Sequence, residues 1–182
     1  MAQAIVFGIG AWIAYRQLDA WRNEAHFRKR VEVSEQLLAA AIAVSDELKA
    51  LRSPMDSIPQ SEIGNFAYVY QKRYQRFIDR NDLFVRLREV QVRAEAVLDD
   101  PKIDDAVQQL FRVRNETATA IEMLAQRSKD SDEDEQTRKF YRSIQNDMYG
   151  SYSAKHDPLG MAQLEAIATL KRLLRPMLSF RK

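Results

Sequence analysis

The chain opens with an uncharged, mostly apolar run and then becomes strongly charged. Residues 1–15 carry no ionisable side chain, and no Gly or Pro interrupts the stretch 16–52 that follows. Apolar residues recur through this stretch at close to helical spacing, which predicts a long helix over 16–52, continuous with the apolar run. Ser53-Pro54 is expected to end it, because the residue before a proline disfavours helical backbone angles. The predicted apolar row is Leu18, Trp21, Ala25, Val31, Leu38, Ile42 and Leu48.

Further helices are predicted over residues 62–98, 101–128, 134–149 and 158–180. Asp100-Pro101 and Asp157-Pro158 are typical helix starts, because aspartate caps the first turn and proline suits the first helical position. The polar stretch 79–82 is a candidate bend. With only five glycines and five prolines in 182 residues, the composition also favours helix. The predicted fold is all-α: an N-terminal membrane-anchor helix continuous with an antiparallel bundle of about four main helices.

Residues 1–15 are interpreted as the membrane anchor. Their apolar side chains are distributed around the helix, as lipid contact requires, and Trp12 and Tyr15 fall at one end, where interfacial aromatic residues occur. At 1.5 Å per residue the segment is about 22 Å long, shorter than the ~30 Å hydrocarbon layer. Bilayer thinning, or a true start upstream of Met1, would account for the difference. The predicted anchor residues are Ile5, Val6, Phe7, Ile9, Trp12, Ile13 and Tyr15.

Two other interpretations of this segment stay open. A secretory signal would have a basic region before its apolar part and small residues at a cleavage site, and neither is present. A buried core helix is the second alternative, since apolar runs of this length often belong to protein cores.

Basic residues follow the apolar run, and none precedes it. The positive-inside rule therefore places residues 16–182 in the cytoplasm as one helical domain. The basic residues expected to contact lipid headgroups are Arg16, Arg22, Arg28, Lys29 and Arg30. A second contact is considered for the basic residues of 171–182, if the last helix returns to the membrane.

The composition restricts the possible chemistry. The net charge of +2 does not suggest a nucleic-acid-binding protein, and the absence of cysteine excludes disulfides and thiolate metal sites. No cofactor or metal motif is recognised, and both His26 and His156 are interpreted as surface residues. The aromatic and basic stretch 68–77 resembles a binding segment, but its aromatic residues are more readily explained as core, with Arg73 and Arg76 on the flank.

The apolar start leading into residues 13–17, the Arg52-Ser53-Pro54 stop and the final helix beginning at Asp157-Pro158 together resemble a loose group of uncharacterised bacterial and prophage-encoded single-pass membrane proteins. The resemblance implies a bacterial inner-membrane location with a cytoplasmic helical body. It implies no activity for any residue.

The favoured functional hypothesis is a non-enzymatic interaction or scaffold module tethered to the inner membrane face. Its expected partners are membrane lipid and either a second copy or an unknown protein. Small residues spaced four apart, Ala4 with Gly8 and Gly10 with Ala14, would allow two such helices to pack closely. The alternatives are a prophage-encoded envelope exclusion or lysis factor, and an enzyme with an unrecognised site.

Overall fold

The structure is a computed structural model that describes residues 2–55, 57–62, 65–126, 134–153 and 155–179, with only the backbone of 2–11, 13, 14, 66 and 179. The all-α prediction is confirmed: the described part of the chain is 87% helix and contains no strand. The α-helices are α1 (Ala2–Leu51), α2 (Phe66–Asp79), α3 (Asn81–Leu98), α4 (Pro101–Gln126), α5 (Glu135–Met148) and α6 (Pro158–Ser179), with a short 3-10 helix, η1, at Gln60–Glu62.

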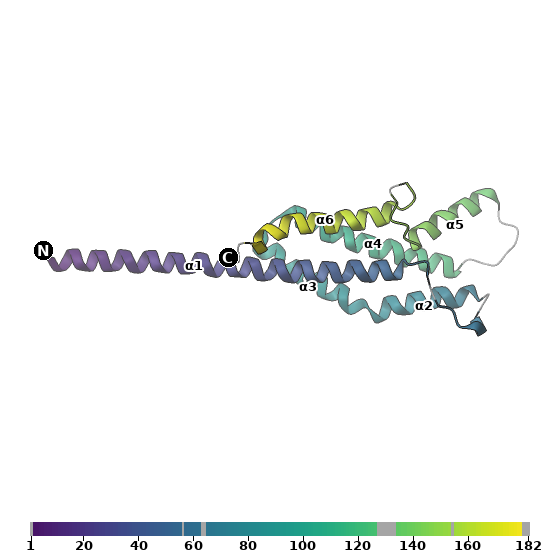
Figure 1. The fold of residues 1–182 in the computed structure, drawn as a ribbon, viewed down its shortest axis with the longest axis horizontal. Helices are drawn as coiled ribbons and strands as arrows, with labels where there is room; N and C mark the ends of the chain where they lie inside the picture. The colour runs from purple at the N-terminus through teal and green to yellow at the C-terminus, as the bar shows by residue number, and fades with distance from the viewer. Residues whose placement is uncertain (1, 56, 63–64, 127–133, 154, 180–182) are drawn as a thin grey trace.

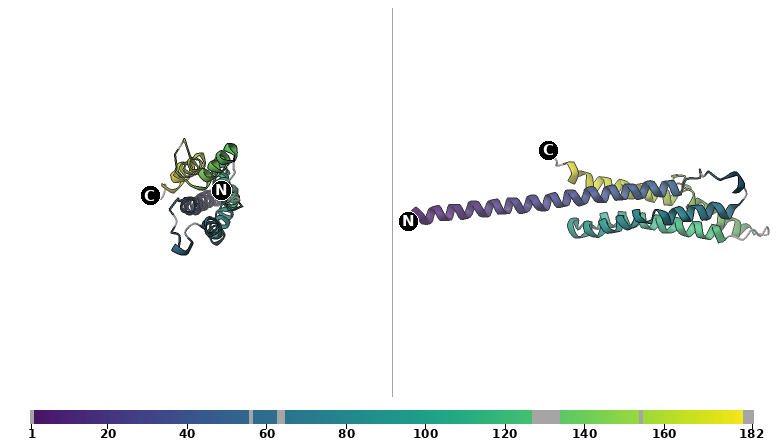
Figure 2. Two further views of the ribbon diagram at one scale, coloured as in Figure 1. Left: turned by 90° about the vertical axis from the view of Figure 1, so that its right-hand side faces the viewer. Right: turned by 90° about the horizontal axis from the view of Figure 1, so that it is seen from below.

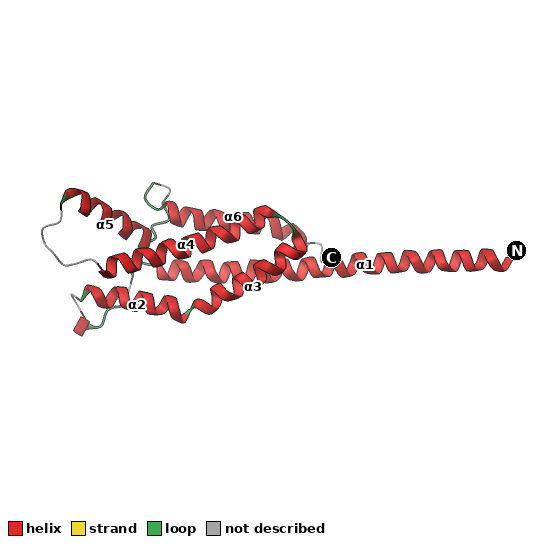
Figure 3. Cartoon of the chain, turned by 180° about the vertical axis from the view of Figure 1, so that it is seen from behind, coloured by secondary structure: helices red, strands yellow, loops and turns green. Residues whose placement is uncertain are grey.

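The helices form an elongated bundle around the C-terminal half of α1 (Figure 1). The chain runs along α1, returns through α2 and α3, runs forward again in α4 and returns in α6 (Figure 2). α1 packs against α3 and α6, whereas α4 packs against α6, α2 and α5. The N-terminal half of α1 extends beyond the bundle with no other helix beside it (Figure 3).

The bundle encloses two groups of buried apolar residues. The larger group joins α1, α3, α4 and α6, and includes Leu37, Leu87, Leu110 and Leu170, all fully buried. The smaller group lies at the far end, between the last turns of α4 and α5. Buried residues recur at helical spacing along α3 and α4: Phe84, Leu87, Val90, Ala94, Leu98, Ile103, Val107, Leu110, Thr117, Ile121 and Leu124.

Two details of the predicted helices differ in the structure. The helix predicted at 62–98 is divided at Arg80 into α2 and α3, within the polar stretch 79–82. In α1, Leu18, Trp21 and Ala25 belong to the predicted apolar row but are exposed, because no described helix packs against α1 before about Val31. Farther along α1 the core row is Val33, Leu37, Ala40, Ala41, Val44, Leu48 and Leu51.

The predicted membrane anchor at residues 1–15, and with it the inner-membrane location, is wrong. Among the described residues, no helix combines the length and apolar character needed to cross a membrane. The physical reason is that the apolar start of α1 is short and runs directly into a charged helix, where Arg16, Asp19 and Arg22 follow within two turns.

Candidate functional site: the exposed arm and its buried attachment

The N-terminal part of α1, residues 2–30, is called the arm here. It is a continuous helix of about 40 Å at 1.5 Å per residue. Every described side chain in it is exposed, including two large aromatic ones: Tyr15 is 71% and Trp21 73% exposed. Single apolar residues on a surface are normal, but here several lie on one helix that no described helix covers, which makes the arm a candidate binding surface.

Charged residues occupy most of the rest of the arm. Arg28 pairs with Glu24 at 2.6 Å and Lys29 pairs with Glu32 at 3.1 Å, both within the helix. The guanidinium of Arg16 lies 5.3 Å from the centre of the Trp12 ring. Exposed pairs of this kind contribute only about 0.3–0.5 kcal/mol each.

The predicted lipid-contacting residues Arg16, Arg22, Arg28, Lys29 and Arg30 therefore all lie on the exposed arm. Of the predicted anchor residues, the side chains of Ile5, Val6, Phe7, Ile9 and Ile13 lie outside the described part. Trp12 and Tyr15 are both exposed.

At the other end of α1, a buried arginine donates hydrogen bonds to backbone carbonyl groups. Arg73 of α2 is only 4% exposed, and its guanidinium donates to the carbonyl of Leu51 and, at 2.7 Å, to that of Ser53. It also lies 4.9 Å from the centre of the Tyr149 ring. A helix ends with unpaired carbonyls and partial negative charge, so a cation placed there is stabilising.

A second buried arginine, Arg52, connects α1 to α6. Its Nη2 donates to Oδ1 of Asp157 at 2.6 Å, and its Nε donates to the Asp147 carbonyl at 3.1 Å. The side chains of Arg52 and Asp157 are 0% and 1% exposed. The ring of Tyr152 lies 5.8 Å from the guanidinium. We call Arg52, Arg73 and Asp157 the buried attachment, because they fix the end of α1 to α2, α5 and α6.

Asp157 is also the N-cap of α6. Its carboxylate accepts hydrogen bonds from the backbone N–H groups of Gly160 and Tyr152, both at 2.7 Å. Burial alone would raise the pKa of Asp157, but the hydrogen bonds from Arg52, Gly160 and Tyr152 outweigh it and hold that pKa below its ordinary value. The carboxylate is therefore kept ionised and fully bonded, which suits a structural role.

Burial also raises the pKa of the Tyr152 hydroxyl, although the charge of Arg52 opposes the shift. The hydroxyl lies 3.5 Å from Oε1 of Gln163, whose amide in turn donates to the Ser45 carbonyl at 2.7 Å. Tyr152 therefore stays neutral at ordinary pH and belongs to the same set of polar contacts between α6 and α1.

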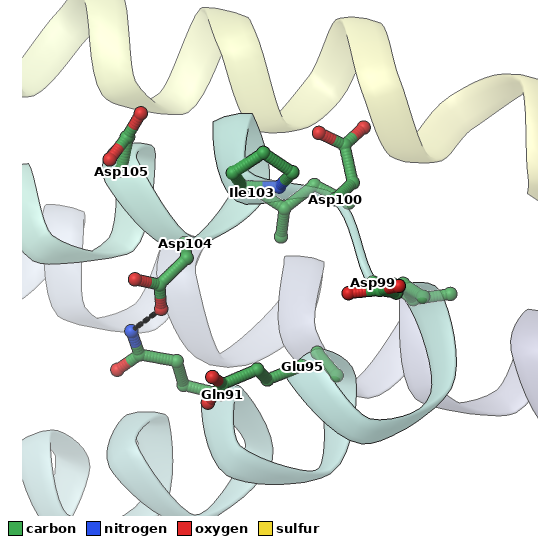
Figure 4. Close-up of a pocket in the computed structure, with 10 residues that line it drawn as sticks. Gln91, Glu95, Asp99, Asp100, Ile103, Asp104 and Asp105 are labelled. Carbon is green, nitrogen blue, oxygen red and sulfur yellow. Dashed lines mark hydrogen bonds between the residues drawn. The ribbon is translucent and has the colours of Figure 1, made fainter.

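An acidic cavity of about 300 Å³ lies at the turn between α3 and α4 (Figure 4). Its acidic lining residues are Glu95, Asp99, Asp100, Asp104 and Asp105. Asp104 accepts a hydrogen bond from the buried Gln91, and Asp99 adopts the left-handed conformation that ends α3. In the described part of the chain, no group of acidic, histidine or cysteine side chains is arranged to hold a metal ion.

Both histidines are exposed, as predicted, His26 on the arm and His156 in the loop before α6. The prediction for the stretch 68–77 is only partly correct. Phe77 is buried, but Tyr74 is 39% exposed, and Arg73, expected on the flank, is buried in the attachment. The acidic run at 130–135 falls mostly outside the described residues.

Searches against protein-family models, curated proteins and solved structures found no match to this chain.

Proposed function

We propose that this protein is an interaction module whose bundle presents the arm of α1 as a docking helix. The observation that carries the proposal is the exposure of Tyr15, Leu18 and Trp21 on a part of α1 against which no described helix packs. This develops the interaction or scaffold role expected from the sequence, without the membrane tether.

The energetics of helices support a docked state for the arm. Isolated helices are marginal in water, and most helix stability in proteins comes from packing of an apolar face. The arm's described support includes exposed ion pairs, the contact of Arg16 with Trp12 and its continuity with the packed half of α1. A groove or helix that covered Leu18 and Trp21 would supply the missing packing.

The buried attachment supports the same role from the other end of α1. Arg52 and Arg73 join the end of this helix to α2, α5 and the start of α6, so the arm continues a helix whose other end is fixed in the bundle. A docking helix held in this way has its bundle end fixed before binding, which lowers the entropic cost of association.

Site-specific photo-crosslinking in cells of the source organism tests the proposal. A photoreactive amino acid at Leu18 or Trp21 is compared with one at Glu122, an exposed position on α4. We expect discrete, larger adducts from the arm positions and none from the α4 position. Arm positions that give no adduct above the Glu122 control would contradict the docking role.

A further inference from the structure

We infer that the arm docks with the arm of a second copy of this chain, in a parallel two-helix coiled coil. This inference rests on the proposed docking function and assigns its partner. The arguments are the spacing of apolar residues on the arm, the charges beside them and the direction in which the bundle leaves the helix.

The apolar seam consists of Leu18, Trp21 and Ala25, all exposed on the arm. Their spacing of three and four residues places them at positions a, d and a of a heptad. In the sequence, Ala11 and Ala14 continue the same register toward the N-terminus. Small residues at such positions allow two helices to approach closely, while Leu18 and Trp21 supply the apolar area.

The charges beside the seam favour a parallel arrangement. In this register Glu24 occupies position g and Lys29 the following position e. Two parallel helices in register bring Glu24 of each chain beside the partner's Lys29, giving two equivalent ion pairs. Both side chains now pair within their own helix and are about half exposed, so exchanging partners costs little.

The bundle leaves the seam uncovered. At 100° per residue, Val33, the first fully buried residue of α1, points about 80° around the helix from Ala25. The next d position after Ala25 is Arg28, whose charge ends the seam before the bundle begins. In two parallel copies, the helices are therefore paired along the arm and separate where the bundles begin, so that the two bundles lie side by side.

Sedimentation equilibrium of the full-length chain over a range of concentrations tests the dimer, with two matched alanine variants. Ala25→Glu places a charge in the seam, whereas Ala20→Glu places the same charge on the far side of the arm. Both alanines are exposed, so neither change disturbs the bundle. We expect concentration-dependent dimers for the unmodified chain and for Ala20→Glu, and a dissociation constant raised at least about tenfold for Ala25→Glu.

Charge exchange and cysteine cross-linking test the parallel orientation of the two arms. Glu24→Lys and Lys29→Glu should each weaken the dimer, and the double exchange should restore it. Because the chain has no cysteine, single Leu18→Cys or Ala25→Cys variants are clean probes. Parallel arms in register predict disulfide-linked dimers from both variants, since each position then faces its own copy.

Three outcomes would overturn the inference. A chain that is monomeric at all concentrations would contradict the dimer. Equal effects of Ala20→Glu and Ala25→Glu would contradict the assignment of the seam as the dimer contact. Failure of the cysteine variants to form disulfide-linked dimers would contradict the parallel, in-register arrangement. If the chain is monomeric but the photoreactive arm positions still form adducts with a different protein, the dimer fails while the docking function stands.

Discussion

Arg52 and Asp157 are both charged, yet they are among the least exposed residues of the bundle. Moving such groups out of water is costly, and their mutual attraction offsets this only when the remaining bonds are also made. Asp157 meets that condition with two backbone donors, and Arg52 does so in part, since its Nη1 is buried without a hydrogen-bond partner in the described structure.

Replacing Asp157 with asparagine should therefore be strongly destabilising. Asp157→Asn keeps the shape but leaves the guanidinium of Arg52 buried without its counter-charge, a situation that typically costs about 3–5 kcal/mol. Urea unfolding followed by circular dichroism measures the loss. The exposed pair of Arg112 and Glu116 provides the control: Arg112→Met should leave the unfolding midpoint nearly unchanged, and a similar loss there would contradict the assignment.

The same carboxylate makes stability depend on acid. The pKa of Asp157 is lower in the folded protein than in the unfolded chain, where it is about 3.9. Its stabilising contribution is therefore complete above pH 4 and is lost as pH falls through the lower, folded pKa. Below pH 4, the stability of the unmodified protein should fall more steeply with acid than that of Asp157→Asn. Parallel curves for the two proteins would show that Asp157 does not contribute.

Gly160 is an exception to the usual effect of replacing a helical glycine with alanine. Alanine within a helix is usually more stable than glycine by about 0.5–1 kcal/mol. At Gly160, however, a Cβ atom would lie 2.8 Å from Cγ of Asp157 and 3.0 Å from Cδ1 of Tyr152. We expect Gly160→Ala to destabilise the protein by roughly 1–3 kcal/mol, as overpacking does. Thermal unfolding measures this, with exposed Glu165→Ala in the same helix as the control; unchanged or raised stability in Gly160→Ala would refute the tight fit.

At the scale of elements, α1 is one helix with two environments. Residues beyond Val33 pack against α3 and α6, whereas every described side chain of the arm is exposed. Amide hydrogen exchange should therefore divide α1: amides of 33–51 should exchange only with global unfolding, and those of 16–30 should exchange far faster at low protein concentration. Raising the concentration should slow the arm amides if two arms pair. Uniform protection along α1 in dilute solution would contradict this division.

The presence of the helices and the residues at which they start can be predicted from local sequence. Asp157 was predicted as the cap of α6 because an Asp-Pro start is a local feature, and the structure confirms it. The exposure of Leu18 and Trp21 was not predictable in this way. Periodicity identifies an apolar face but not whether another helix covers it, and in α1 the covering helices begin only near Val31.

At the scale of the whole molecule, the parts that the sequence could not reveal are those that join distant segments. Arg52 and Asp157 lie 105 positions apart, and Arg73 reaches a carbonyl 22 residues earlier. The signals were present as an arginine beside a helix stop and an aspartate at a helix start. Pairing them requires knowing that α6 returns alongside α1, which hydrophobic patterns alone do not determine.

The separation between Arg52 and Asp157 also affects how the chain is made. During synthesis the arm leaves the ribosome before the bundle does, whereas Asp157 emerges only after helices α1 to α5. Arg52, at the end of α1, thus has no counter-ion until the start of α6 has been made, by which time the arm has already emerged.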